Sequence, residues 1–198
     1  MLNKIKKNRK NFYVSAISCG IIFIIGLLYV LVPAYYGYEN MELINTNNLF
    51  VTLMLVLSTL GFGEYLLVGK NPTEETIYFS ICSAICGIIN IFLKNLLDDV
   101  GRLTTSLTIF LIIYALIKCF TIEYLHNKKD AYQYIEIMLL VPFVTVSAIM
   151  IFILNSSSVV RCVSLGYITI LYAILKSVGV SIKAMLKSKR FLRKIKLK

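Results

Sequence analysis

Three ionisable residues lie inside long apolar segments of this chain: Glu64, Lys118 and Lys176. A charged side chain at the centre of a membrane helix costs roughly 2.5–3.5 kcal/mol, so such residues are rare there and most often serve ion or proton pathways or pair with one another. If the three side chains converge, one carboxylate lies between two ammonium groups. Because that arrangement is suited to ions or protons, we treat the three residues as the candidate intramembrane ionisable layer.

The same three residues also allow structural interpretations. Each lies within about two helical turns of the end of its apolar segment, where a lysine can extend its ammonium to the lipid headgroups and also interact with the C-terminus of its helix. A glutamate and a lysine can instead form an ion pair that holds two helices together. The depth of the residues decides between these roles and transport.

Other reactive groups are scarce. The cysteines all lie in apolar segments, which disfavours structural disulfides; they are Cys19, Cys82, Cys86, Cys119 and Cys162. Cys82 and Cys86 share a helical face, but no His, Asp or Glu in their segment completes a metal site. The single histidine, His126, lies between apolar segments, and no hydrolase or metalloprotease motif is present. We therefore predict no catalytic residue, metal or cofactor, and a protein that is not an enzyme.

Composition indicates that the natural solvent of the chain is lipid. Of its 198 residues, 58% are apolar and 16% are charged, whereas a soluble domain carries roughly a quarter charged residues. The apolar residues form segments of about 20, long enough to cross a hydrocarbon core of about 30 Å. Segments such as 21–32 are apolar on every face, which excludes the alternating pattern of a barrel strand. The sequence predicts an all-α, polytopic membrane bundle.

We predict six transmembrane helices, over residues 13–35, 46–68, 77–94, 103–123, 133–154 and 159–182. They form one membrane domain at 13–182, between a basic head at 1–12 and a basic tail at 183–198. The first span is too long for a cleaved signal, so we expect it to be retained. In the tail, apolar residues are interspersed with eight basic ones, which predicts an amphipathic helix on the anionic membrane surface.

The net charge of +11 is concentrated beside the membrane. Of the 21 Lys and Arg residues, thirteen lie in the head and tail, where they contact anionic lipids rather than nucleic acid. With the N-terminus in the cytoplasm, sixteen basic residues fall on the cytoplasmic side and three on the outer side. This bias predicts that both termini are cytoplasmic. Neither a protein partner nor a homo-oligomer is indicated, and both remain open.

Similarity between spans indicates three copies of a helical hairpin. Segment 114–118 (Tyr-Ala-Leu-Ile-Lys) recurs 58 residues later at 172–176 (Tyr-Ala-Ile-Leu-Lys). Segment 86–92 aligns with 146–152 at an offset of 60, and Glu64 closes a weaker copy in the second span. Each unit contains an even number of crossings, so the three hairpins are parallel. In this register the three ionisable residues occupy equivalent positions.

The first span closes on Gly-Leu-Leu-x-x-Leu-x-Pro at 26–33. With its six spans and three hairpin repeats, the chain resembles, over about residues 13–186, the HdeD-type acid-resistance membrane proteins. The later units depart from the pattern, with Lys94 and Leu154 near the place of the proline. The resemblance implies a bacterial inner-membrane protein of acid or envelope stress tolerance, and no functional residue is carried over. The alternative is a small transporter or channel that uses an interhelical cavity near the ionisable layer.

Overall fold

The computed structural model describes residues 2–37, 45–68, 74–124, 131–154 and 157–196, and these residues form helices and no strand. The helices are α1 (Leu2–Tyr36), α2 (Thr46–Val68), α3 (Glu74–Phe92), α4 (Asp99–Tyr124), α5 (Ala131–Ile153) and α6 (Ser158–Lys196), with a short 3-10 turn, η2 (Leu93–Asn95), after α3. The predicted all-α fold is confirmed. His126 lies outside the described residues.

Within the described residues, five of the helices are long and apolar enough to cross a membrane. Their apolar parts are Asn11–Tyr36, Thr46–Val68, Ile77–Asn95, Asp99–Phe120 and Ser158–Ile182. The apolar part described in α5, Ile137–Ile153, is shorter. A helix is the expected conformation of such segments because it satisfies every backbone N–H and C=O without water.

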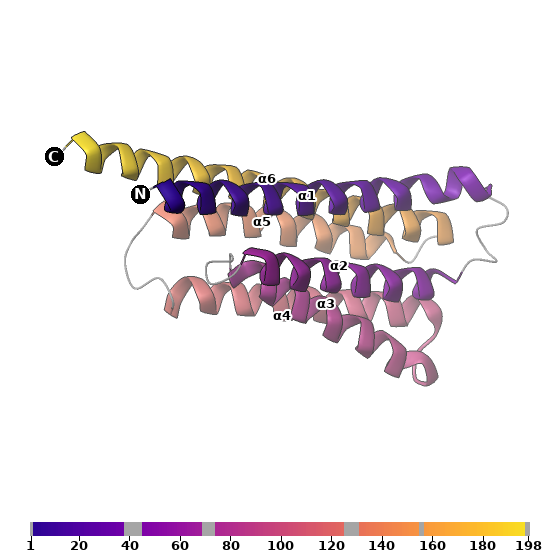
Figure 1. Ribbon diagram of the computed structural model, residues 1–198. Coiled ribbons are helices and arrows are strands. Elements are labelled where there is room, and N and C mark those ends of the chain that lie inside the picture. Colours follow the sequence, from indigo (N-terminus) through magenta and orange to yellow (C-terminus); the bar gives the residue numbers. More distant parts are fainter. Residues whose placement is uncertain (1, 38–44, 69–73, 125–130, 155–156, 197–198) are drawn as a thin grey trace.

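The basic head and tail continue the first and last helices. α1 begins at Leu2, and α6 runs without a break to Lys196. At 1.5 Å per residue, the 39 residues of α6 extend about 58 Å, compared with about 30 Å for the hydrocarbon core. The tail, which we expected as a helix on the membrane surface, is therefore an extension of the last span. Both termini lie at the same end of the bundle (Figure 1).

Local side-chain contacts explain several helix ends. Asn45 Oδ1 accepts hydrogen bonds from the backbone N–H groups of Asn47 and Asn48, at 3.0 and 3.2 Å. Asp98 caps the first turn of α4 in the same way. Such caps satisfy N–H groups that the first turn of a helix leaves without a partner. After α1, Gly37 has a φ of 82°, a left-handed conformation that glycine adopts without strain.

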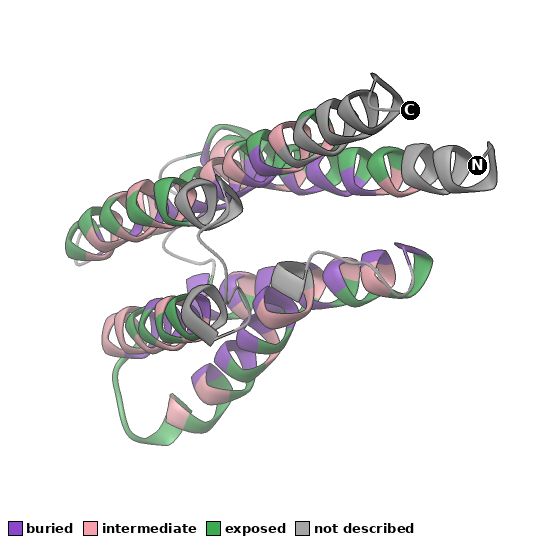
Figure 2. Ribbon diagram, turned by 90° about the vertical axis from the view of Figure 1, so that its left-hand side faces the viewer, coloured by how far each residue is buried: buried purple, intermediate pink, exposed green. Residues whose placement is uncertain are grey.

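The helices form two layers of three, with α1, α5 and α6 in one layer and α2, α3 and α4 in the other (Figure 1). Figure 2 shows both layers from the side, with buried residues on faces turned toward neighbouring helices. The closest packing is between α1 and α6 and between α2 and α3. α1 and α2 belong to different layers and pack against each other less closely than α1 packs against α6, and the repeat arrangement stays a prediction.

Glycines bring α1 and α6 into backbone contact. A Cβ atom added to Gly166 would lie 2.7 Å from the carbonyl oxygen of Gly26 and 2.9 Å from the amide nitrogen of Val30. A Cβ atom on Gly26 would lie 3.0 Å from the carbonyl oxygen of Gly166. Small residues allow such close approach, which drives helix association in lipid through van der Waals contact.

An aromatic cluster joins the two layers. Phe79 of α3 stacks on Tyr172 of α6, with ring centroids 3.6 Å apart, and meets Tyr114 of α4 edge to face at 5.4 Å. Phe143 of α5 contacts both tyrosine rings, at 5.6 and 5.8 Å. Such pairs contribute about 0.5–1.5 kcal/mol each beyond the area they bury. Each tyrosine lies four residues before a lysine of the ionisable layer, so the aromatic cluster borders that layer.

Candidate functional site: a buried ion pair beside a small cavity

Glu64 and Lys176 form an ion pair in the interior of the bundle. Lys176 Nζ lies 2.5 Å from Glu64 Oε2, and the two residues are 4% and 7% exposed. The Ser15 hydroxyl donates to Glu64 Oε1 at 2.7 Å, and Lys176 Nζ donates to Ser18 Oγ at 3.3 Å. Both carboxylate oxygens therefore have a partner. We call these four residues the ion-pair cluster.

The ion-pair cluster links the two layers. Glu64 belongs to α2, whereas its partners belong to α1 and α6. Ser15 and Ser18 lie on one face of α1 because residues three apart are neighbours on a helix surface. Glu64 precedes Val68, the last residue of α2, by four residues, which corresponds to about 6 Å along the helix axis. The charged groups thus lie inside the bundle, about one turn from the end that carries both termini.

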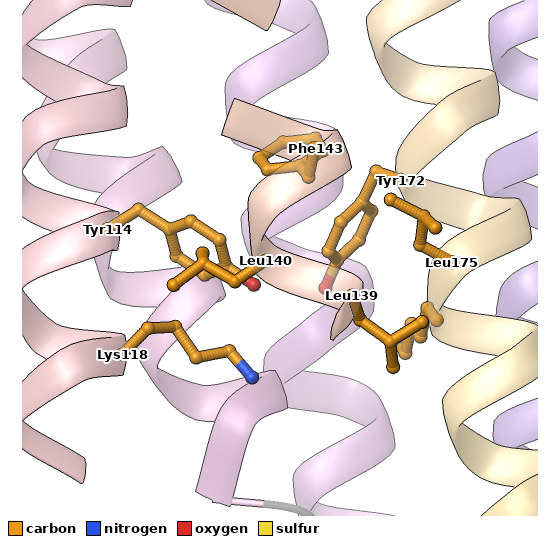
Figure 3. Close-up of a pocket in the computed structure, with 8 residues that line it drawn as sticks. Tyr114, Lys118, Leu139, Leu140, Phe143, Tyr172 and Leu175 are labelled. Carbon is orange, nitrogen blue, oxygen red and sulfur yellow. The ribbon is translucent and has the colours of Figure 1, made fainter. Parts of the chain in front are cut away.

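Lys118 and Lys176 line a small cavity. Its volume is about 20 Å³, and its walls are formed by Tyr114, Lys118, Leu139, Leu140, Phe143, Tyr172, Leu175 and Lys176. Figure 3 shows the Lys118 ammonium and the hydroxyls of Tyr114 and Tyr172 gathered around the same space. Since a single water requires about 10–15 Å³, the cavity has room for one small species.

The positions of Lys118 and Lys176 bear on whether these lysines extend to the headgroups or take part in a structural ion pair. The ammonium of Lys176 contacts Glu64 and Ser18 inside the bundle and does not extend to the lipid headgroups. Lys118 is 4% exposed, so it is also enclosed by protein. The geometry therefore matches a structural Glu–Lys pair better than lysines that extend to the headgroups. It also brings both lysines to one cavity, as the repeat equivalence suggested.

A second polar network lies among α2, α3 and α4, toward the opposite end of the bundle. The buried Asn90 donates to Asn47 Oδ1 at 3.0 Å and to Ser106 Oγ at 3.2 Å. Arg102 donates to Asn90 Oδ1 at 3.2 Å and pairs with Asp99 at 3.2 Å. A buried polar group left without a partner costs about 1–3 kcal/mol, so this network favours one packing arrangement of its layer.

Several of these polar residues were not singled out from the sequence. The prediction followed charges inside apolar segments and did not include their uncharged partners. The available signals were the two serines three residues apart in the first span, and Asn47 and Asn90 inside the second and third. Arg102 is one of the three basic residues counted on the predicted outer side, and its side chain lies buried against Asn90.

The cysteines pack as small apolar residues with weak donors. Cys86 donates to the carbonyl of Ser106 at 3.0 Å, and Cys162 to that of Tyr29 at 3.3 Å. None of the five cysteines, all of which lie within the described residues, forms a disulfide. Within the part of the chain that the structure describes, no group of three His, Cys, Asp or Glu residues could hold a metal ion.

The site can therefore do two things. The ion-pair cluster can hold α1, α2 and α6 together through charge and hydrogen bonds, and the cavity can hold one small species between two lysines and two tyrosines. Comparison with known proteins finds no matching family model, no matching curated protein and no matching solved structure.

Proposed function

We propose that this chain is a non-enzymatic, multi-pass bacterial membrane protein that acts in acid or envelope stress tolerance, as its resemblance to the HdeD-type proteins implies. The supporting observation is the ion-pair cluster. Both oxygens of Glu64 are engaged and the residue is buried, which is typical of a group that fixes helix packing. Because removing one partner of a buried pair costs about 3–5 kcal/mol, the cluster favours a closed bundle.

The proposed location is the cell inner membrane, with both termini in the cytoplasm and the basic tails against anionic lipids. Two observations support it: the bias of sixteen basic residues to three, and the position of both termini at one end of the bundle (Figure 1). Basic segments beside a membrane attract anionic lipids by about 1 kcal/mol per Lys or Arg.

Fusions to alkaline phosphatase, which is active only outside the cytoplasm, test this orientation. A fusion at the C-terminus is expected to be inactive because the basic tail is retained inside. An insertion after Leu96, in the exposed connection between α3 and α4, is expected to be active and serves as the matched control. An active C-terminal fusion would overturn the proposed orientation.

A second candidate function is transport of a small ion. It is favoured by the cavity itself, which has two ammonium groups and two tyrosines in its wall and includes residues of both layers. Ionisable residues inside a membrane protein often mark ion pathways. A volume of about 20 Å³ admits a water or a monatomic ion and excludes larger solutes.

Acid survival and vesicle flux together separate the two functions. We expect a bacterial host that expresses the chain to survive acid exposure better than a host with an empty vector, and liposomes that contain the purified chain to stay as impermeable to protons and halides as protein-free liposomes. A bundle closed around the paired Glu64 and Lys176 offers no path for ions, which is the physical reason for tight vesicles.

The transport function predicts a different result. A pH-sensitive or halide-sensitive dye would then report flux that is lost in Glu64→Gln and kept in Lys94→Gln, a substitution at an exposed residue. That pattern would defeat the stress-tolerance proposal in favour of transport, whereas tight vesicles would remove transport. Equal survival with and without the chain would contradict the role in acid tolerance.

A further inference from the structure

We propose that Arg161, at the end of the bundle opposite both termini, binds a phosphate group. Two sources can supply such a group at this end: the headgroup of a phospholipid and free inorganic phosphate. The inference concerns binding alone. It depends neither on the stress function nor on the cavity beside Lys118, because Arg161 lies at the other end of α6 from Lys176.

Arg161 lies between the first turns of two helices that belong to different layers (Figure 1). α6 begins at Ser158 and α2 at Thr46. Arg161 Nη2 donates to Ser158 Oγ at 3.1 Å, and Nη1 donates to Thr46 Oγ1 at 3.5 Å. Thr46 is buried and Arg161 is half-buried. The two hydroxyls therefore orient the guanidinium at the junction of the layers.

The guanidinium of Arg161 has donors and a charge that its described neighbours do not match. Of its five N–H donors, one goes to each of the two neutral hydroxyls, and two further N–H donors remain on the Nη atoms. The Nε atom is buried without a hydrogen-bond partner. No carboxylate of the described residues forms an ion pair with Arg161. Because burial of an unpaired charge is costly, a group with several anionic oxygens stabilises this position.

The other charges described at this end do not neutralise Arg161. They are Lys94, Asp98, Asp99 and Arg102. Asp99 pairs with Arg102 at 3.2 Å, and its side chain is 60% exposed, so water also hydrates it. Asp98 caps the first turn of α4, and Lys94 is exposed. With Arg161, three cations stand against two carboxylates among these described residues, which leaves one positive charge at this end.

The depth of Arg161 suits the phosphate of a phospholipid. The apolar part of α6, Ser158–Ile182, has 25 residues and extends about 37 Å, compared with about 30 Å for the hydrocarbon core. The first turn of α6 therefore reaches the level of the headgroups. A planar guanidinium binds phosphate through two parallel N–H···O bonds, whereas a lysine ammonium acts as a point charge. The chemistry of the ligand follows from this geometry.

Thermal unfolding of the purified chain in a phosphate-free detergent tests the free ion, with sodium phosphate compared against sodium chloride at equal ionic strength and pH. If free phosphate is the source, it raises Tm in a saturable manner, by about 2–4 °C when its concentration is about fivefold above its Kd. Arg161→Gln is expected to abolish this shift. Lys94→Gln removes an exposed charge at the same end and is expected to keep it.

Native mass spectrometry from mixed micelles that contain phosphatidylglycerol tests the lipid as the source. Arg161→Gln is expected to retain one phosphatidylglycerol fewer per chain than the unchanged protein, and Lys94→Gln is expected to retain the same number. The basic head and tail, which attract the same lipid at the opposite end, are identical in both variants. Diacylglycerol, which lacks the phosphate, is expected not to be retained.

Three results would overturn the proposal. The first is that neither phosphate nor phosphatidylglycerol binds in a manner that depends on Arg161. The second is full binding by Arg161→Lys, which keeps the charge but loses the paired N–H groups; it provides the test if Arg161→Gln does not fold. The third concerns Glu39 and Glu42, which lie outside the described residues. If binding at Arg161 appeared only after both were replaced with glutamine, a carboxylate of the chain itself would be the partner of Arg161.

Discussion

Replacement of Lys176 with methionine is expected to lower the free energy of unfolding by about 3–5 kcal/mol, because it leaves a buried carboxylate without its cation. Glu64 is 4% exposed and its Oε2 atom lies 2.5 Å from Lys176 Nζ, so bulk water does not hydrate the carboxylate that is left behind. Ser18 loses its hydrogen bond in the same substitution. Reversible unfolding of the purified chain in mixed micelles with increasing SDS measures the change.

Two further variants identify the cause of this loss. The double variant Glu64→Gln with Lys176→Met removes both charges and is expected to recover most of the stability, since a buried pair replaced by neutral groups of similar shape is often nearly neutral in energy. Lys94→Met, at an exposed lysine, is expected to change the free energy of unfolding by less than about 0.5 kcal/mol. If Lys176→Met changed the free energy of unfolding as little as Lys94→Met does, that result would contradict a buried ion pair between Glu64 and Lys176.

The helices were largely predictable because a segment that crosses the bilayer must be composed mainly of apolar residues. A segment of about 20 apolar residues must satisfy its own backbone groups, and only a helix does so within one segment. The second span was predicted at 46–68, and α2 has these bounds. The ends beyond the apolar segments were less predictable. The tail was expected to be a helix, but its continuity with the last span was not predicted: α6 runs without a break to Lys196, because strong helix formers such as Lys, Arg and Leu continue a helix that has already formed.

The helix pairing was less predictable than the helices. The repeat favoured hairpins of neighbouring helices, yet α1 packs most closely on α6. In lipid, the burial of apolar surface does not determine which helices pair, because lipid tails are as apolar as the side chains. The pairing depends on a few small or polar residues from distant parts of the sequence. Ser15 bonds to Glu64, 49 residues away, and Ser18 bonds to Lys176, 158 residues away. No local pattern encodes such pairs.

The ionisable residues of the site were found because charge inside an apolar segment is conspicuous, and their partners were missed because serine and asparagine are common in membrane helices. Tyr114 and Tyr172 stood in the repeated segments, but the sequence alone did not indicate which residues their side chains contact. The repeat therefore contained more information about the cavity than the charges alone, because it specified two side chains per copy on a shared helix face.

The close contact of α1 with α6 predicts opposite effects for one kind of substitution at two glycines. Gly166→Ala is expected to lower the free energy of unfolding by about 1–3 kcal/mol, since its Cβ atom would lie 2.7 Å from the carbonyl oxygen of Gly26 and overpack the crossing. Gly20→Ala is the matched control on α1. A Cβ atom there meets nothing within 4 Å, so the higher helix propensity of alanine is expected to stabilise the protein by up to about 1 kcal/mol.

The same crossing aligns the ion-pair cluster, because the contact at Gly166 sets the distance from α1, which carries Ser18, to α6, which carries Lys176. If the two helices move apart, the hydrogen bond from Lys176 to Ser18 lengthens, and the ion pair between Lys176 and Glu64 is held in place less firmly. Gly166→Ala and Lys176→Met are therefore expected to be non-additive in a double-mutant cycle, with a coupling above about 0.5 kcal/mol. Additive effects, or equal tolerance of alanine at Gly166 and Gly20, would mean that backbone contact at Gly166 does not position the buried charges.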